Sequence, residues 1–431
     1  MIRKIKPAAD NLLTASKKQE TSLNYFWYGF VIYQLFFVLA YTESSFLSAA
    51  SCQGFQIIGF GLMGMGAAGL MTFKFDDKYL KQLFIINLLY SVTIILRGSA
   101  YDKDALKQMF LDVTFGILPY LTPLVMLLPR NIRNYKKIFN VLLIFGFFFM
   151  LSVLMFYNTL HDYDRLNLVS QGLVEILSVM LSLPIAFFLF NYFYHPEKKA
   201  LLGLGLKNIF GIFVILVTLF FAIFRARRGL IFMCVSSMAC FGMIYIINTK
   251  NKMLIIIMSA IMILGGAFYV INVKTPAMFN YLIDRADSDT RTGVEVYMYA
   301  DMSPVDWVIG KGIKGQYYCP VVDNVNDASG QGYRETIETG YLQIILKGGI
   351  VSLGLLLLMF LPAVYKGFFK SQNILSKAAA MWIFLWIVYL YPAGGIVFNF
   401  NYVLVWVATG ICYSERIRNM SDNTIKTYLQ N

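Results

Sequence analysis

The sequence predicts an all-α polytopic membrane protein, and three observations indicate this class. Of the 431 residues, 58% are hydrophobic and only 14% are charged, whereas a soluble protein of this size has roughly a quarter charged residues. The apolar residues gather in runs of about 20, the length that crosses a bilayer as a helix. Lys and Arg lie mostly in alternate short loops, which is the pattern of inserted helices.

The apolar runs along the chain give about twelve spanning helices, with ten to twelve as the range. The third run is short, and the last two are separated only by the turn Pro392–Gly395. The expected helices lie near 24–42, 54–73, 82–97, 110–128, 138–157, 168–193, 208–224, 229–247, 253–273, 340–364, 378–392 and 396–412. The predicted organisation is a segment 1–23, helices within 24–273, a large loop 274–338, helices within 339–412 and a tail 413–431.

The distribution of basic residues predicts the orientation of the chain. It places both termini in the cytoplasm and the loop 274–338 outside. Loops longer than about 15 residues are usually functional or disordered, and the many aromatic residues of this one argue against disorder. We therefore expect it to fold as a cap over the outer mouth of the bundle. The formal net charge of +13 follows from the same loop pattern, so no nucleic-acid partner is expected.

A cluster of arginines lies between two apolar runs in the middle of the chain. The uncharged runs 208–224 and 229–247 flank the sequence FRARRG. We expect a helical hairpin whose turn carries Arg225, Arg227 and Arg228. Guanidinium groups at membrane depth are costly unless an anion pairs with them, so these residues are a functional hypothesis by default.

Further ionisable residues are expected at the same depth, near the outer leaflet. They are Asp112, Glu175, Arg285, Arg291 and Glu338. In one interpretation Glu175 and Asp112 pair with the arginines and hold the bundle together. The three arginines outnumber these two carboxylates, so at least one guanidinium needs another anion. A phosphate group suits it, because the planar fork of arginine makes bidentate hydrogen bonds to phosphate.

The sequence predicts no metal site and no cofactor. Its two histidines, His161 and His195, lie in loops on opposite sides of the predicted membrane, so they cannot form one site. Asp287 and Asp289 form a D-x-D pair, a spacing seen at divalent-metal sites, but in an acidic loop such a pair is more often a solvated face.

Cysteines and glycines are interpreted structurally. Cys52 and Cys319 fall in two outer segments, where two unpaired thiols are favoured over a bridge between them. Close helix packing is the interpretation favoured for Gly61, Gly64, Gly66 and Gly69.

Three stretches within 205–365 carry a resemblance to a known family. Arg228–Gly229 looks like a Ser-Arg-Gly motif with Arg227 in place of the serine. Asp289–Gly312 looks like an arginine, matched by Arg291, followed by a Pro-x-x-x-x-x-Gly-x-Gly element. Glu338–Gly349 looks like a His-Asn-x-Tyr-Leu…Gly re-entry segment. Together they resemble the O-antigen polymerase and O-antigen ligase superfamily of polytopic membrane glycosyltransferases.

The resemblance implies an activity and a location. A glycan on a polyprenyl diphosphate would be transferred, without metal, to a hydroxyl of another lipid-linked repeat unit at the periplasmic face of the bacterial inner membrane. The ligase histidine is Glu338 here and the asparagine is Thr339, which favours a polymerase of O-antigen or capsule. The lipid bilayer is a partner, with a chain-length regulator and a flippase as further candidates.

Residue roles follow from the same resemblance and from the chemistry. Arg228 and Arg291 would grip the diphosphate while Glu338 activates the acceptor hydroxyl, with Glu175 as the second candidate for this base. The residues expected to bind substrate are Arg225, Arg227, Arg285, Glu175, Tyr341 and Trp307. Two alternatives remain open: a ligase that uses a lipid core acceptor, and a lipid-linked glycan flippase or other transporter. Transporters tend to place their site at mid-membrane between two repeats, whereas the ionisable residues here are expected at the outer rim.

Overall fold

The computed structural model describes residues 17–41, 47–98, 103–130, 132–157, 168–182, 184, 187, 206–224, 227–248, 291–320, 332–392 and 395–430. This part of the chain is mostly helical, with one two-stranded sheet. It contains five helices long and apolar enough to cross a membrane, which are Lys18–Ala40, Lys78–Leu96, Asn134–Met155, Leu206–Ile223 and Gly340–Phe369. The architecture is that of an all-α membrane protein.

Most of the apolar runs form helices close to where the sequence predicts them. These helices are α2 (Lys17–Tyr41), α3 (Ala49–Leu70), α4 (Lys78–Leu96), α7 (Ile132–Met155), α9 (Leu168–Ser182), α11 (Leu206–Phe224), α12 (Arg228–Asn248), α17 (Gly340–Phe369), α18 (Ile374–Tyr389) and α19 (Phe400–Tyr413). The predicted helix 253–273 lies outside the described residues. The tail forms α20 (Glu415–Arg418) and α21 (Asp422–Gln430).

The prediction of one continuous helix over 110–128 is wrong. The chain instead forms α5 (Lys103–Leu111), α6 (Leu118–Leu121) and the 3₁₀ helix η1 (Thr122–Leu127). Pro119 lies in the first turn of α6, and Pro123 lies in the first turn of η1. Proline lacks the N–H that a helix interior requires, so it occurs at the first turn of a helix rather than inside one.

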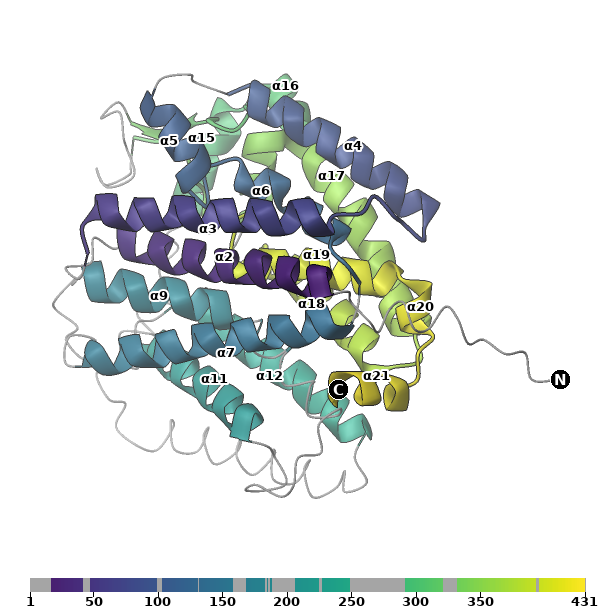
Figure 1. The fold of residues 1–431 in the computed structure, drawn as a ribbon. Coiled ribbons are helices and arrows are strands. Elements are labelled where there is room, and N and C mark those ends of the chain that lie inside the picture. The colour runs from purple at the N-terminus through teal and green to yellow at the C-terminus, as the bar shows by residue number, and fades with distance from the viewer. Residues whose placement is uncertain are drawn as a thin grey trace, which may run out of the picture.

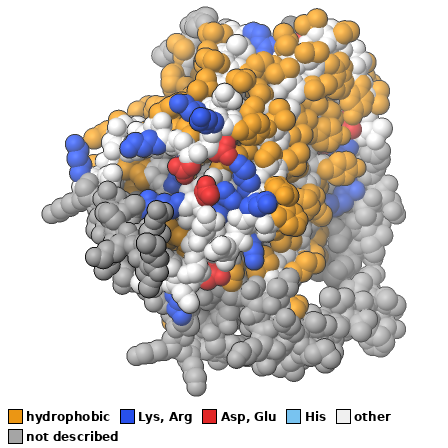
Figure 2. All heavy atoms as spheres, turned by 90° about the vertical axis from the view of Figure 1, so that its right-hand side faces the viewer, with side chains coloured by type: hydrophobic (Ala, Val, Ile, Leu, Met, Phe, Trp, Pro, Cys, Tyr) orange, Lys and Arg blue, Asp and Glu red, His pale blue; other side chains and the backbone are white. Residues whose placement is uncertain are grey.

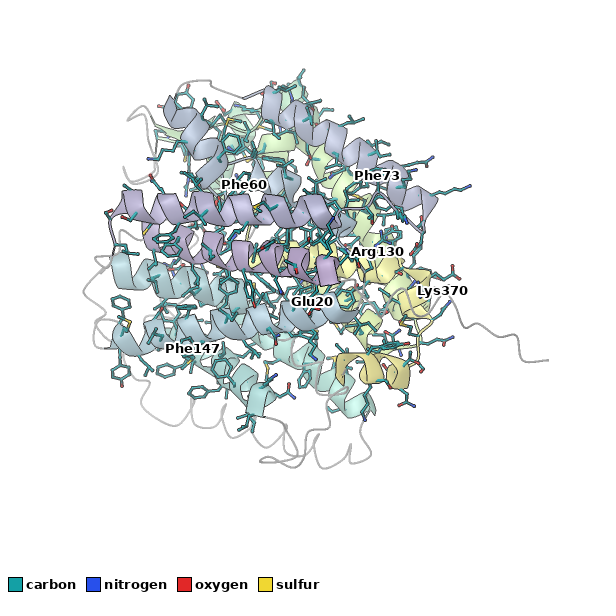
Figure 3. The ribbon with its side chains drawn as sticks, viewed as in Figure 1. Glu20, Phe60, Phe73, Arg130, Phe147 and Lys370 are labelled. Carbon is teal, nitrogen blue, oxygen red and sulfur yellow. The ribbon has the colours of Figure 1, made fainter. Side chains whose placement is uncertain are left out.

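The helices form a bundle (Figure 1). α2 and α3 lie side by side, with α7, α9, α11 and α12 on one side and α4 and α17 on the other. Figure 2 faces the end where α2 begins, and there Lys, Arg, Asp and Glu gather next to a broad hydrophobic flank. In Figure 3, Arg130 and Lys370 lie toward that end, whereas Phe147 lies toward the other.

Aromatic side chains fill the middle of the bundle. Trp27, Phe30 and Phe145 are all buried. The rings of Phe30 and Phe145 pack edge to face with centroids 6.2 Å apart, and Phe30 makes a similar contact with Phe400 at 5.8 Å. Edge-to-face pairs are favourable because the positive ring edge meets the negative ring face. This core joins α2, α7 and α19.

Glycines bring α2 and α3 into close contact, and the packing role predicted from the sequence is confirmed for Gly66 and Gly69. A Cβ added at Gly66 would lie 2.5 Å from the backbone nitrogen of Phe26, and one at Gly69 would lie 2.5 Å from the hydroxyl of Ser22. Small residues allow such close approach. The expectation is wrong for two glycines, because an added Cβ would meet no described atom within 4 Å at Gly61 or Gly64.

The described part of the loop 274–338 folds against the start of α17. It contains α15 (Thr292–Asp301), α16 (Pro304–Ile309) and an antiparallel pair of strands, β1 (Tyr317–Tyr318) and β2 (Tyr333–Arg334). Met298, Tyr317 and Cys319 from the loop are buried together with Leu346 of α17. Cys52 lies in α3 and is also buried, and both thiols are free, so the two cysteines form no bridge.

A break in α17 anchors the loop 274–338, which we call the outer loop after the position predicted from the sequence. Gly349 has φ 67° and ψ 180°, so the helical hydrogen-bond ladder is interrupted there. The carbonyl of Leu346 instead accepts from the N–H of Lys311 at 2.8 Å, and that of Lys347 from the N–H of Gly312 at 2.9 Å. The Gly-x-Gly element of the sequence is therefore a structural joint between the loop and α17.

Candidate functional site

A cavity of about 430 Å³ lies where α9, α12, α17 and α18 meet. It is at the end of the bundle opposite to the start of α2, because α18 ends and α12 begins there. Its lining includes Thr114, Glu175, Val179, Arg227, Arg228, Gly229, Leu230, Arg291, Thr336, Ile337, Glu338, Gln343, Tyr389, Pro392, Gly395, Ile396 and Val397. Five of the residues singled out from the sequence thus face one cavity.

The turn of the α11–α12 hairpin delivers two of the guanidinium groups. The N–H of Arg227 donates to the carbonyl of Ala222 at 2.8 Å, which closes the end of α11. The carbonyl of Arg227 then accepts from Leu230 and Ile231, each at 3.0 Å, and so begins α12. Arg228 is the first residue of α12 and is exposed where it lines the cavity. The positive end of the α12 dipole adds to the attraction for an anion.

Arg227 is held by the carboxylate that α9 contributes. Its Nη2 lies 2.6 Å from Oε2 of Glu175, and the two side chains are 33% and 29% exposed. The Nε of Arg227 is buried and has no hydrogen-bond partner among the described residues. An unsatisfied buried donor costs about 1–3 kcal/mol, so this guanidinium has capacity for a further acceptor.

A second ion pair joins the outer loop to the segment before α17. Nε of Arg291 lies 3.5 Å from Oε2 of Glu338, and the Glu338 side chain is 62% exposed. Arg291 also donates from Nη2 to the carbonyl of Pro392, in the connection after α18. This side chain therefore ties three segments together at the rim of the cavity. The Glu338 pair is longer and more exposed than the Glu175 pair.

Two predicted substrate contacts, Trp307 and Tyr341, do not line this cavity. Trp307 stacks on Tyr299 with ring centroids 5.9 Å apart, and both Trp307 and Tyr341 pack against the small core of the outer loop. Glu295, which the sequence reasoning did not single out, accepts hydrogen bonds from Tyr299 at 3.3 Å and from the hydroxyl of Thr339. Burial, together with the Glu295 carboxylate, raises the pKa of Tyr299 to about 12. Sequence spacing gives no signal for this cluster.

Two other predicted contacts, Arg225 and Arg285, lie outside the described residues. The sequence reasoning also missed Gln343 and Tyr389, which line the cavity. Gln343 accepts through its side chain from the N–H of Ile337 at 2.8 Å and so shapes the approach to α17. Its place in the re-entry segment is the signal that could have identified it.

Asp112 has a structural role and forms no ion pair with an arginine among the described residues. Its Oδ1 accepts from the N–H of Thr114 at 2.7 Å and of Phe115 at 2.8 Å, in the bend after α5. Burial raises the pKa of this carboxyl, and the two N–H donors offset only part of that effect. Of the two carboxylates expected to neutralise the arginine turn, only Glu175 is seen to do so.

The cavity is suited to binding an anion. Three positive guanidinium groups and two negative carboxylates line it, and arginine binds phosphate oxygens with bidentate geometry. The described residues contain no cluster of three or more His, Cys, Asp or Glu that could hold a metal ion. Comparison with models of known protein families, with curated proteins and with solved structures finds no match. The function is therefore inferred from the residues of the cavity.

Proposed function

We propose that this chain is a metal-independent membrane glycosyltransferase that polymerises the repeat units of a bacterial surface polysaccharide. It would transfer the glycan from a polyprenyl diphosphate to a hydroxyl of another lipid-linked repeat unit. The observation that carries the proposal is the gathering of Arg227, Arg228 and Arg291 with Glu175 and Glu338 on one cavity at a helix-bundle end. That set offers both an anion clamp and a candidate base.

The proposal includes a membrane orientation. Both termini would lie in the cytoplasm of the inner membrane, with ten to twelve spans, and the cavity would face the periplasm. The excess of basic residues in alternate loops supports this orientation. The cavity and the start of α2 lie at opposite ends of the bundle, which is the arrangement that the orientation requires.

In the proposed reaction Arg228 and Arg291 bind the diphosphate of the donor. The acceptor hydroxyl transfers its proton to Glu338 as its oxygen bonds to the anomeric carbon. The bond between that carbon and the diphosphate oxygen breaks, and its electron pair leaves on the diphosphate. Guanidinium groups placed beforehand stabilise this developing charge without reorganisation.

Geometry favours Glu338 over Glu175 as the base. Glu175 is engaged by Arg227 at 2.6 Å and is 29% exposed, so it holds that guanidinium in place. Glu338 is separated from Arg291 by 3.5 Å and is 62% exposed, so an acceptor hydroxyl can approach it. A general base must come within hydrogen-bond reach of the proton that it takes.

The test is a reconstituted assay with defined lipid-linked repeat units. Purified wild-type protein should yield a ladder of lengthened glycans. Arg228→Ala should lower the rate by about 10²–10³-fold, the usual cost of one transition-state donor, and Glu338→Gln by about 10²–10⁴-fold, the usual contribution of one proton-transfer group. Lys377→Ala and Glu415→Gln are the matched controls, because each removes an exposed charge of the same sign outside the cavity.

Each outcome of this assay discriminates between functions. A ladder that depends on Arg228 and Glu338 supports the polymerase. Transfer only onto a lipid core acceptor would instead assign ligase chemistry, and translocation with no new bond would assign a transporter. Full activity in Arg228→Ala and Glu338→Gln would remove the roles proposed for these two residues.

A further inference from the structure

A second cavity lies at the opposite end of the bundle and plays no part in the proposed reaction. It has a volume of about 210 Å³, several times the ~30 Å³ that one water molecule occupies. We call it the basic pocket. Its lining consists of Thr72, Lys74, Asp76, Met126, Leu127, Leu128, Pro129, Arg130, Ser414, Arg416 and Ile417.

Most of the charged side chains that line the basic pocket are positive. Lys74, Arg130 and Arg416 contribute three positive charges to the lining, and Asp76 contributes one negative charge. The carboxylate of Asp76 accepts from Ser414 at 3.3 Å and lies 3.5 Å from Nη1 of Arg130. The lining therefore holds more positive than negative side chains, which favours an anion.

Arg130 is fixed in place at the back of the pocket. Its side chain is 15% exposed, its Nη2 donates to the carbonyl of Lys74 at 2.9 Å, and its guanidinium lies 5.5 Å from the ring centroid of Phe75. A planar, pre-oriented guanidinium loses little freedom when it binds a phosphate. Lys74 and Arg416 are exposed at the mouth, where they can close on a ligand.

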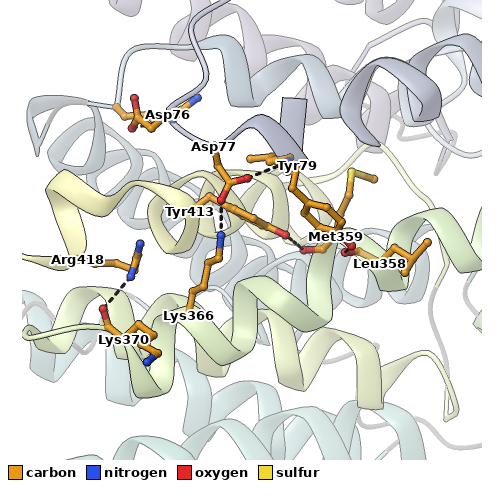
Figure 4. Close-up of polar contacts among 11 residues, drawn as sticks. Asp76, Asp77, Tyr79, Leu358, Met359, Lys366, Lys370, Tyr413 and Arg418 are labelled. Atoms are coloured by element: carbon orange, nitrogen blue, oxygen red, sulfur yellow. Dashed lines mark hydrogen bonds and ion pairs between the residues drawn. The ribbon is translucent and has the colours of Figure 1, made fainter. Parts of the chain in front are cut away.

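Contacts between α4, α17 and α19 hold the walls beside the pocket (Figure 4). Asp77 is paired with Lys366, whose ammonium lies 4.3 Å from the ring centroid of Tyr413. Tyr413 donates to the carbonyl of Met359 at 3.1 Å. Asp77 is therefore engaged elsewhere, and its charge is not available to neutralise the pocket.

At this end of the bundle, charged side chains gather next to a hydrophobic flank (Figure 2). The inner wall of the basic pocket is apolar, with Met126, Leu127 and Leu128 buried. Phe73, one residue before Lys74, is 52% exposed, and exposed aromatic rings are typical of the membrane–water interface. A ligand seated here would meet cations and apolar surface together.

We propose that the basic pocket binds the phosphate group of an anionic phospholipid from the leaflet at this end of the bundle. Basic pockets between helices on the cytoplasmic side of membrane proteins are suited to anionic headgroups. Arg130 would donate hydrogen bonds to the phosphate oxygens at the back of the pocket, and Lys74 and Arg416 would pair with them at its mouth. The acyl chains would extend along the apolar flank. The site is independent of the proposed glycosyl transfer.

The test uses the purified full-length protein in a zwitterionic detergent. Phosphatidylglycerol is titrated and the retained lipid is counted by native mass spectrometry, with zwitterionic phosphatidylcholine, whose net charge is zero, as the reference lipid. The test variant is Lys74→Ala with Arg416→Ala, which removes two exposed charges without disturbing Arg130. The matched control is Lys78→Ala with Lys377→Ala, which removes two exposed charges outside the pocket.

A basic residue near an anionic membrane surface contributes about 1 kcal/mol, so the test variant should bind phosphatidylglycerol about thirtyfold more weakly. The control variant should stay within about twofold of the wild type. Equal binding by the wild type and the test variant, or equal losses in both variants, would overturn the proposal. Binding of inorganic phosphate with no binding of phosphatidylglycerol would overturn the assignment of a lipid and leave only an anion site.

Discussion

Replacement of Gly349 by alanine should destabilise the protein by disrupting the joint between α17 and the outer loop. At φ 67° and ψ 180° the backbone occupies a region that is essentially restricted to glycine. A Cβ there would lie 2.5 Å from the backbone nitrogen of Ile309 and closer still to the carbonyl oxygen of Val308. Both obstacles are backbone atoms, so α16 and α17 would have to separate.

The cost can be worked out from the contacts that would be lost. The backbone conformation alone costs about 1–3 kcal/mol for a residue with a side chain. Separation would also break the hydrogen bonds from Lys311 to Leu346 and from Gly312 to Lys347, each worth about 0.5–1.5 kcal/mol. The expected loss in the free energy of unfolding is therefore roughly 2–6 kcal/mol.

Unfolding of the purified protein, followed by tryptophan fluorescence during a denaturant titration, measures this loss. Gly354→Ala is the matched control, because Gly354 lies in the same helix and an added Cβ would meet no described atom within 4 Å. That control should be neutral or stabilise by about 0.5–1 kcal/mol. If Gly349→Ala unfolds within 1 kcal/mol of the control, the break in α17 does not hold the loop as described.

Three further predictions concern residues outside the cavity. Burial raises the pKa of Asp112, so its carboxyl makes the folded state less stable as pH rises above about 4. Asp112→Asn removes this carboxyl but keeps an acceptor for the bend, so the variant should unfold at neutral pH no more easily than the wild type. Asp112→Ala removes the acceptor as well and should lower the free energy of unfolding by about 0.5–2 kcal/mol. Burial alone would raise the pKa of Asp77, but Lys366 and the N–H groups that begin α4 hold it below its usual value. The stability of the wild type should therefore fall as pH drops below about 4. Melting curves between pH 6 and 3 should show a smaller fall in melting temperature for Asp77→Asn. Gly66→Val should lower the melting temperature strongly because it meets the backbone of α2, while Gly61→Val should change it little, and equal effects would contradict the packing.

The helices could be predicted where hydropathy alone decides the structure. The α11–α12 hairpin follows from two uncharged runs that are long enough to cross a bilayer and are separated by charged residues. Hydropathy fails over 110–128, where Pro119 and Pro123 interrupt a run that is mostly apolar. Here the backbone chemistry of proline, rather than the length of the apolar run, decides where the helices begin.

The candidate site could be predicted only as a set of residues at one depth. Charges at helix ends identified Arg228 and Glu338, because such charges are costly near a membrane. Their partners depend on which helices pack together, and no spacing in the sequence indicates that Glu175 of α9 meets Arg227 of α12. Trp307 was expected to contact substrate as a stacking face of the aromatic-rich loop; it is partly buried against the core of that loop, and its contact with substrate stays a prediction.

The two ion pairs of the cavity divide into a structural and an exchangeable one. Arg227 and Glu175 form the shorter and less exposed pair, so loss of Arg227 leaves a half-buried carboxylate without its partner. Arg291 and Glu338 form a longer pair that a diphosphate can replace at little cost, since Glu338 is 62% exposed. Under the proposed function, the entering substrate therefore takes Arg291 from Glu338 and frees that carboxylate to accept a proton.

This division predicts that one arginine substitution mainly lowers stability and another mainly weakens substrate binding. Arg227→Ala should lower the free energy of unfolding by about 1–2 kcal/mol, which is less than for a fully buried pair because about a third of each side chain is exposed. A second substitution in the same chain, Glu175→Gln, removes the carboxylate left without its partner and should restore much of this stability. Arg291→Ala should instead weaken binding of a polyprenyl diphosphate about tenfold, equivalent to ~1.4 kcal/mol, with a smaller change in melting temperature. A reversed pattern, with stability depending on Arg291 and binding on Arg227 alone, would show that the exchangeable pair has been assigned to the wrong carboxylate.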